Sequence, residues 1–113
     1  MKTIKFRGKD DNGEWKDVEL PYFLFSNPET ISECTGLKDS NGTDIYEGDI
    51  LVSSSFKHLI VYDLSEARFA LMQLPIGDYD KPMGISQSWI NEFSKKIIGN
   101  KYDNPELMKR DKE

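Results

Sequence analysis

Alternation of apolar and polar residues is the first structural signal in this chain. Thr3–Arg7 and Trp15–Leu20 alternate with a period of two, which is the side-chain period of a β-strand with one buried face. Asp10-Asp11-Asn12-Gly13 lies between them, and Asn and Gly both tolerate the positive φ angles of a tight turn. The pattern therefore predicts a β-hairpin. Pro21 ends its second strand, because proline has no backbone N–H to donate.

The middle of the chain predicts further short strands. Continuous apolar runs at Ile50–Val52, Leu59–Tyr62 and Phe69–Leu74 are typical of buried strands, and Gly48-Asp49 indicates a kink before the first of them. The less regular segments with strand character are Thr30–Thr35 and Lys96–Tyr102. Tyr22–Phe25 fits either a short buried strand or a loop with aromatic anchors.

Helical signals are confined to the last third of the chain. Trp89, Ile90 and Phe93 share one helical face, with Ser86 or Ser88 as the cap. Asn104-Pro105 predicts the start of another short helix. Pro75–Gly84 is rich in turn-forming residues, and we expect a mobile loop there. Many short strands with little helix predict a mainly β fold, a small barrel or roll with at least five strands in its main sheet.

One short motif occurs twice, as Lys9-Asp10-Asp11-Asn12-Gly13 and as Lys38-Asp39-Ser40-Asn41-Gly42. The repeat is either a duplicated recognition loop or the same turn chemistry used in two hairpins. The flanking residues do not match, so we favour two hairpin turns, in which Asp bonds back to the backbone and Asn-Gly takes the left-handed positions.

Composition limits the classes of function. The chain has 113 residues, a net charge of −5 and one cysteine, which fits a single domain without an intrachain disulfide. No stretch reaches the roughly 20 apolar residues of a membrane helix, and no apolar segment typical of a signal peptide follows Met1. We therefore expect a cytoplasmic protein with no membrane partner. The acidic balance opposes general nucleic-acid binding, which needs a basic surface.

Charge is unevenly distributed along the chain. Residues 1–16 and 95–113 are net basic, whereas residues 17–94 are net acidic. This distribution is either ordinary solvated charge or the basis of self-complementary association, with a basic edge against an acidic face.

Catalytic and metal-binding patterns are weak. Cys34 and His58 are the only cysteine and histidine, so one chain cannot form the usual Cys/His zinc site. A Cys34–His58 nucleophile pair is conceivable, but the setting of Cys34 has nothing that would lower its pKa, and a packed thiol is favoured. Among the clustered carboxylates Asp39, Asp44, Glu47 and Asp49, acid–base work would need two held across a cleft, and a solvated acidic rim is the simpler interpretation.

A calcium loop is also disfavoured. Asp39–Asp44 resembles the start of an EF-hand loop, but Asp44 stands where that loop needs glycine, and Ile50 stands where it needs a bidentate glutamate. We predict a hairpin turn instead, and overall no catalytic residue, metal site or cofactor.

Three segments in order carry a family resemblance. They are Ile4–Lys9 followed by Gly13-Glu14-Trp15, then Thr35–Gly42 running into Ile45–Ile50, then Ile97–Asn100 followed by Tyr102 and Asn104–Leu107. Together they resemble the YopX family of small bacteriophage and prophage proteins. The positions that carry the resemblance are mainly turn, bulge and core residues, which we interpret as structural: Gly8, Gly13, Trp15, Gly36, Leu37, Asp39, Asn41, Gly42, Tyr46, Gly48, Asp49 and Gly99.

The resemblance implies a small SH3-like β-barrel with an N-terminal β extension that can join oligomer contacts. On this basis we predict one domain over residues 1–108, with the extension at 1–34, the barrel at 35–108 and a charged tail at 109–113. The leading hypothesis is a non-catalytic phage or prophage accessory protein that binds an unknown host or phage protein, with homo-oligomerisation through the N-terminal strands. The alternatives are a nucleic-acid-associated barrel, an acidic mimic of nucleic acid, and an enzyme.

Overall fold

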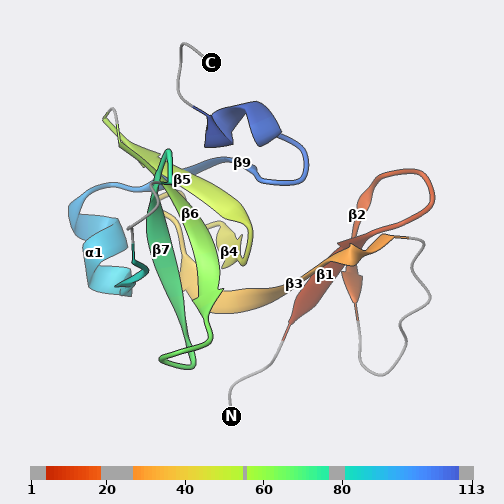
Figure 1. Cartoon of the computed structure of the whole chain (residues 1–113), viewed down its shortest axis with the longest axis horizontal. Helices are drawn as coiled ribbons and strands as arrows, with labels where there is room; N and C mark the ends of the chain where they lie inside the picture. Colours follow the sequence, from red (N-terminus) through yellow and green to blue (C-terminus); the bar gives the residue numbers. More distant parts are fainter. Residues whose placement is uncertain (1–4, 19–26, 55, 77–80, 110–113) are drawn as a thin grey trace.

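The computed structural model describes residues 5–18, 27–54, 56–76 and 81–109. Its strands form two antiparallel sheets, shown in Figure 1, with strand orders β2-β1-β3-β4 and β8-β7-β6-β5-β9. The elements in chain order are β1 (Phe6–Lys9), β2 (Trp15–Val18), β3 (Asn27–Lys38), β4 (Asp44–Tyr46), β5 (Asp49–Ser53), β6 (Phe56–Asp63), β7 (Arg68–Leu74), β8 (Met83–Gly84), α1 (Gln87–Glu92), β9 (Lys96–Asn100) and the 3-10 helix η1 (Pro105–Met108).

The mainly β prediction is confirmed, as are the β1–β2 hairpin, the break at Gly48-Asp49 between β4 and β5, and a main sheet of five strands. Over the described residues the two sheets do not close into a barrel, because each ends in edge strands. The apolar run Tyr22–Phe25 lies outside the described residues. So does the centre of the expected loop at 75–84, whose last two residues form β8 on the edge of the main sheet.

Strand β3 connects the hairpin to the rest of the molecule. It has 12 residues and extends beyond the predicted Thr30–Thr35 segment at both ends. Its first part pairs with β1, where Arg7 faces Ser32, and its last part pairs with β4, where Cys34 faces Tyr46. Figure 1 shows β3 running from the hairpin into the body of the fold. The predicted boundary between extension and barrel therefore falls within one continuous strand.

The central strands β5, β6 and β7 are buried on both faces, as their continuous apolar runs predict. One face, together with β4 and α1, forms the cluster Ile45, Leu51, Ile60, Leu71 and Ile90. The opposite face forms a second cluster of Ile50, Leu59 and Leu74, against which Leu107 of η1 packs. Each such side chain stabilises the fold by about 1.5–3 kcal/mol when fully buried.

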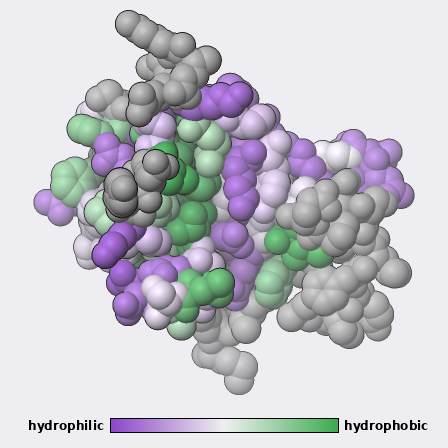
Figure 2. All heavy atoms as spheres, in the orientation of Figure 1, coloured by the Kyte–Doolittle hydropathy of each residue, from purple (hydrophilic) through white to green (hydrophobic). Residues whose placement is uncertain are grey.

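The surface follows this arrangement. Figure 2 shows apolar atoms gathered on the side that carries α1, β6 and β7, and a polar band between them and the hairpin. None of the helices among the described residues is long and apolar enough to cross a membrane.

Helix α1 begins and ends with local capping structures. The Ser86 hydroxyl accepts a hydrogen bond from the Trp89 backbone N–H at 3.2 Å, which confirms Ser86 as the cap. At the other end Ser94 has a φ of +51°, and the Lys95 N–H donates back to the Ile90 carbonyl at 2.9 Å. This six-residue closure usually contains glycine at the left-handed position. It turns the chain so that Lys95 enters the interior, where it is 3% exposed.

The two copies of the repeated motif form the same turn. Asp10 accepts from the N–H groups of Asn12 and Glu14, and Asp39 accepts from the equivalent N–H groups of Asn41 and Thr43, all at 2.9–3.0 Å. The hairpin interpretation is therefore supported. In both turns only the glycine has a positive φ, so the expectation that Asn also takes a left-handed position is wrong. The loop is a type I turn closed by a glycine bulge, in which Asn occupies an ordinary position.

Asp39 has a role that Asp10 lacks. Its second carboxylate oxygen accepts from the Ile97 N–H at 3.1 Å, which ties the turn to β9, and the residue is 5% exposed. We predict that Asp39→Ala lowers the free energy of unfolding by about 2–3 kcal/mol, because it leaves three N–H groups without their acceptor. The matched variant Asp10→Ala, in the exposed copy of the turn, costs at most about 1 kcal/mol. Urea unfolding of both variants measures the difference, and equal losses would contradict it.

Candidate functional site

A buried ion pair joins the N-terminal hairpin to the main sheet. Arg7 of β1 donates to the Asp49 carboxylate at the start of β5, with 2.5 Å between Nη2 and Oδ1. The other Asp49 oxygen accepts from the Tyr46 backbone N–H at 2.8 Å. The Arg7 guanidinium also lies 4.5 Å from the centre of the Trp15 ring and 4.4 Å from that of Tyr46. Both aromatic faces therefore enclose a cation whose counter-ion is Asp49.

Burial and pairing oppose one another at Asp49. The residue is 1% exposed, and this burial raises the pKa of its carboxyl group, while the Arg7 charge and the Tyr46 hydrogen bond lower it. Arg7 Nε has no hydrogen-bond partner in the structure, although it is buried. The pair therefore stabilises the interface only while both partners are present.

Asp103 makes a second connection beside the first. Lys9 forms an ion pair with it, the Trp15 indole N–H donates to it at 2.8 Å and the Asn100 side-chain amide donates at 3.1 Å. The hydrogen bond from Lys9, followed by those from Trp15 and Asn100, lowers the pKa of Asp103 to about 2. The hairpin is thus held to the segment after β9 as well as to β5.

Gly48 shows why one motif glycine is required at this junction. Its φ is +93°, and a Cβ atom there would lie 3.1 Å from the Tyr102 ring. The left-handed backbone would strain any other residue, and a Cβ atom would also require the Tyr102 ring to move by a few tenths of an ångström.

The structure distributes the predicted motif residues over three places. Gly13 is in the first turn, and Asp39, Asn41 and Gly42 form the second. Trp15, Tyr46, Gly48 and Asp49 meet at the Arg7 junction. The remaining positions lie within strands: Gly8 on β1, Gly36 and Leu37 on β3, and Gly99 on β9. Each of these places is a turn, a strand or the junction between the two sheets.

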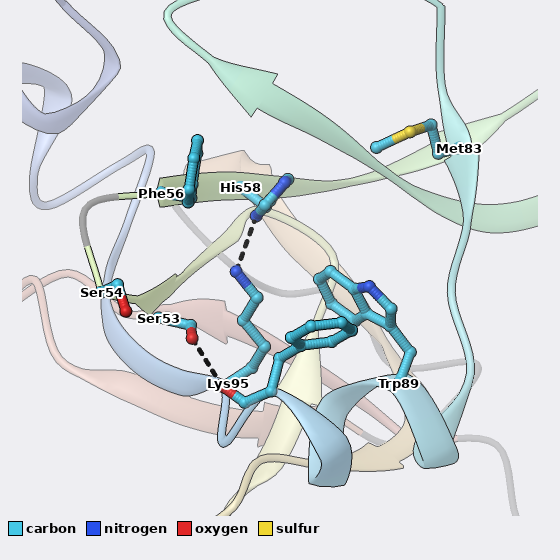
Figure 3. Close-up of a pocket in the computed structure, with 8 residues that line it drawn as sticks. Ser53, Ser54, Phe56, His58, Met83, Trp89 and Lys95 are labelled. Atoms are coloured by element: carbon cyan, nitrogen blue, oxygen red, sulfur yellow. Dashed lines mark hydrogen bonds between the residues drawn. The ribbon is translucent and has the colours of Figure 1, made fainter.

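A pocket with different chemistry lies at the far end of β5 and β6. Its volume is about 360 Å³, and side chains from β5, β6, β8, α1 and the turn after α1 surround it (Figure 3). Its lining residues are Ser53, Ser54, Phe56, His58, Met83, Trp89, Phe93 and Lys95. Phe56, Met83 and Phe93 are large apolar residues that are 55%, 49% and 49% exposed. An apolar rim that remains in water is typical of a binding surface.

Lys95 lies in the floor of this pocket. Its amine is 3.1 Å from His58 Nδ1, as the dashed line in Figure 3 shows, and 4.9 Å from the centre of the Trp89 ring. Burial lowers the pKa of Lys95, and burial together with the Lys95 charge lowers the pKa of His58 to about 4. His58 is therefore neutral at pH 7, and in the tautomer protonated at Nε2 its Nδ1 accepts a hydrogen bond from an N–H of the lysine ammonium.

The residues considered for catalysis are not brought together. Cys34 is buried on β3, which fits a packed thiol, whereas His58 lies on β6 in the other sheet and has Lys95 as its partner. Asp39 bonds to backbone N–H groups, Asp44 pairs with Lys5 and Lys38, and Asp49 pairs with Arg7. Among the described residues, no three His, Cys, Asp or Glu side chains are placed to share a metal ion.

The pocket was not predicted from the sequence. The sequence pattern placed Trp89, Ile90 and Phe93 on one helical face. Ile90 enters the core and Trp89 packs against the same cluster, but the Trp89 and Phe93 rings, whose centres are 6.0 Å apart, also line the pocket. Lys95 carried no signal, because it stands beside Lys96 in a polar stretch and no glycine marks the turn before it. The charge pattern alone could not separate the buried lysine from the exposed one.

The fold and the two clusters define a small two-sheet antiparallel β protein whose sheets are joined by a buried ion pair. A model of the YopX family, described as YopX protein, matches residues 2–109, and the chain belongs to this family. The crystal structure of protein EF1440 from Enterococcus faecalis is similar, with a TM-score of 0.64 and 24% sequence identity over 95% of this chain and 99% of that chain. That likeness concerns the fold alone. No curated protein matches the chain.

The junction yields a test by double mutation. We predict that Arg7→Met lowers the free energy of unfolding by about 3 kcal/mol, because it leaves a buried carboxylate without its counter-ion. Adding Asp49→Asn should recover part of this loss, because the charge that needed a partner is then gone. Lys5→Met removes an exposed ion pair with Asp44 and should have little effect. Additive effects of the Arg7 and Asp49 changes in chemical denaturation would argue against a coupled pair.

His58 predicts a pH dependence of stability. Its pKa is 6.5 in the unfolded chain and about 4 in the folded chain, so the unfolded chain binds more protons between these values. Stability should therefore fall as pH decreases from 6.5 to 4, by at most about 3 kcal/mol and less where water reaches the ring. The raised pKa of Asp49 acts in the opposite direction, so the comparison is with His58→Gln, in which this loss is absent. Urea unfolding between pH 4.5 and 7 measures this loss. If the free energy of unfolding has the same pH dependence in the wild type and in His58→Gln, His58 is not its source.

Proposed function

We propose that this YopX-family chain is a non-catalytic accessory protein, encoded by a phage or prophage, that binds another protein in the cytoplasm of the bacterial host. The pocket between β6 and α1 is the observation that supports the proposal most directly. Its rim exposes Phe56, Met83 and Phe93, and burying these side chains against a partner would remove apolar surface from water. Aromatic residues and methionine are also the types enriched at protein interfaces.

The state of the charged motif residues supports a non-catalytic role. Arg7 and Asp49 pair with each other, and Lys9 pairs with Asp103, so these groups hold the hairpin in place and are not directed toward an open site. The same pairing weighs against nucleic acid as the partner. The cations Lys5, Arg7 and Lys9 of the hairpin are each matched by a carboxylate of the same chain, and the net charge is −5.

We also propose that the N-terminal strands take part in self-association. Strand β2 (Trp15–Val18) is an edge strand that pairs with β1 on one side, and an edge offers backbone groups to a second copy. Sedimentation equilibrium over a concentration series should give a mass above the 13.0 kDa of one chain. A constant monomer mass would remove this part of the proposal.

Partner capture from lysate of the host cell tests the binding function. The wild-type chain is compared with Phe56→Ser and Phe93→Ser, which remove apolar rim, and with Leu64→Ser as the control. Leu64 is 86% exposed in the turn between β6 and β7 and does not line the pocket, so its loss should leave capture unchanged. We expect each rim variant to reduce capture at least tenfold, because buried aromatic side chains dominate interface energetics. Capture that is equal in all four proteins, or absent in all, would contradict the proposal.

A further inference from the structure

We infer that the pocket selects an acidic peptide segment of its partner, with an Asp or Glu side chain bound to Lys95 and a neighbouring large apolar side chain on the aromatic rim. This inference rests on the proposed protein-binding function and states the chemistry of the partner.

Lys95 places a buried positive charge in the pocket without a counter-ion from the described residues. Its side chain is 3% exposed, and among the described residues no carboxylate lies within ion-pair distance of its amine. Taking an ammonium group out of water without a counter-ion is costly. The Trp89 face and His58 Nδ1 compensate part of that cost, and a carboxylate from a partner would compensate the rest.

The Lys95 amine also has N–H donors available for a ligand. An ammonium group has three N–H donors, and His58 Nδ1 takes one of them. Among the described residues this amine makes no other hydrogen bond, so two donors remain for a ligand, and the oxygens of a carboxylate can accept both. In Figure 3 the Lys95 amine points toward His58 across the pocket floor, with Phe56 and Trp89 on either side.

The apolar walls of the pocket favour a ligand that carries an apolar group beside its carboxylate. Phe56 and Phe93 stand at the rim and the Trp89 ring faces Lys95, so the walls are apolar where the floor is charged. A low-polarity setting strengthens an ion pair, provided that the ligand also covers the rim and excludes water. A free carboxylate ion would leave that rim in water. A peptide with an apolar residue beside its acid satisfies both parts of the pocket.

This arrangement differs from the ion pairs elsewhere in the chain. Arg7, which is also enclosed by aromatic rings, has its carboxylate supplied by Asp49. Lys95 has the corresponding aromatic contact, but the described chain supplies no acid to it. Charge complementarity therefore favours an acid supplied by the partner.

Selection from a displayed library of random internal peptides on the full chain tests the inference. Because the random segment has no free C-terminus, any carboxylate in it comes from a side chain. Enriched peptides are resynthesised with both ends blocked and compared with versions in which Asn or Gln replaces the acid. Binding is followed by NMR at the indole N–H of Trp89, with that of Trp15 at the distant junction as the internal reference.

Lys95→Met is the test variant and Lys96→Met is its matched control, since Lys96 is exposed on β9. Thermal unfolding and the Trp15 signal verify that each variant is folded. We expect enrichment of Asp or Glu next to a large apolar residue and at least tenfold weaker binding of the amide versions. The acid preference should disappear in Lys95→Met and persist in Lys96→Met.

Failure of the inference and failure of the proposed function are distinguishable. Peptides that need Phe56 and Phe93 but bind equally as acid or amide would overturn the inference and leave the binding function standing. Peptides insensitive to Phe93→Ser, or no enrichment at all, would overturn both. Phenylacetate serves as a small competitor, and binding as tight as that of the peptides would assign the pocket to a small aromatic acid and overturn the inference.

Discussion

The guanidinium of Arg7 is enclosed by the rings of Trp15 and Tyr46 and pairs with Asp49, and this contact holds the two sheets together. Strand β3 connects the hairpin covalently to β4, but a continuous strand does not fix the angle at which the hairpin lies. Because Asp49 is buried and also accepts from the Tyr46 N–H, any shift of the hairpin would expose an unpaired charge to the interior. The ion pair therefore penalises other arrangements of the sheets more than it adds to stability.

The same strand that begins at this junction ends at the pocket. Strand β5 starts with Asp49 and finishes with Ser53, so the two sites lie about 13 Å apart at roughly 3.3 Å per residue. The register of β5 against β6 places His58 opposite Leu51 and Phe56 opposite Ser53. Fixing Asp49 at one end thus helps to set the positions of two pocket residues at the other. The junction residues Arg7 and Asp49 do not line the pocket themselves.

Arg7 and Lys95 both lie against aromatic rings, with opposite consequences. Arg7 pairs with a carboxylate of its own chain, Asp49, so its electrostatic interaction energy stabilises the fold. Lys95 lies against one ring, that of Trp89, and its hydrogen-bond partner among the described residues is a neutral histidine, so part of its hydrogen-bonding capacity remains for a ligand. Burying the Lys95 ammonium without a counter-ion lowers the stability of the isolated protein, and residues that lower stability are typical of functional positions. This contrast is the physical basis for treating the first cluster as structural and the second as a binding site.

Local signals in the sequence determined most of the strands, both Asp-x-Asn-Gly turns and the Ser86 cap, because each depends on residues a few positions apart. They did not determine the closure of the strands, which form two open sheets where a barrel was expected, since strand pairing depends on packing between distant segments. The pocket also depended on tertiary structure. Phe56 and Lys95 meet because β5 lies between β6 and β9, and Lys95 turns inward through a left-handed Ser94 that no glycine marks. Short-range hydrogen bonding and periodicity can be read from the chain, whereas the burial of one lysine and the exposure of its neighbour are decided only when the strands pack.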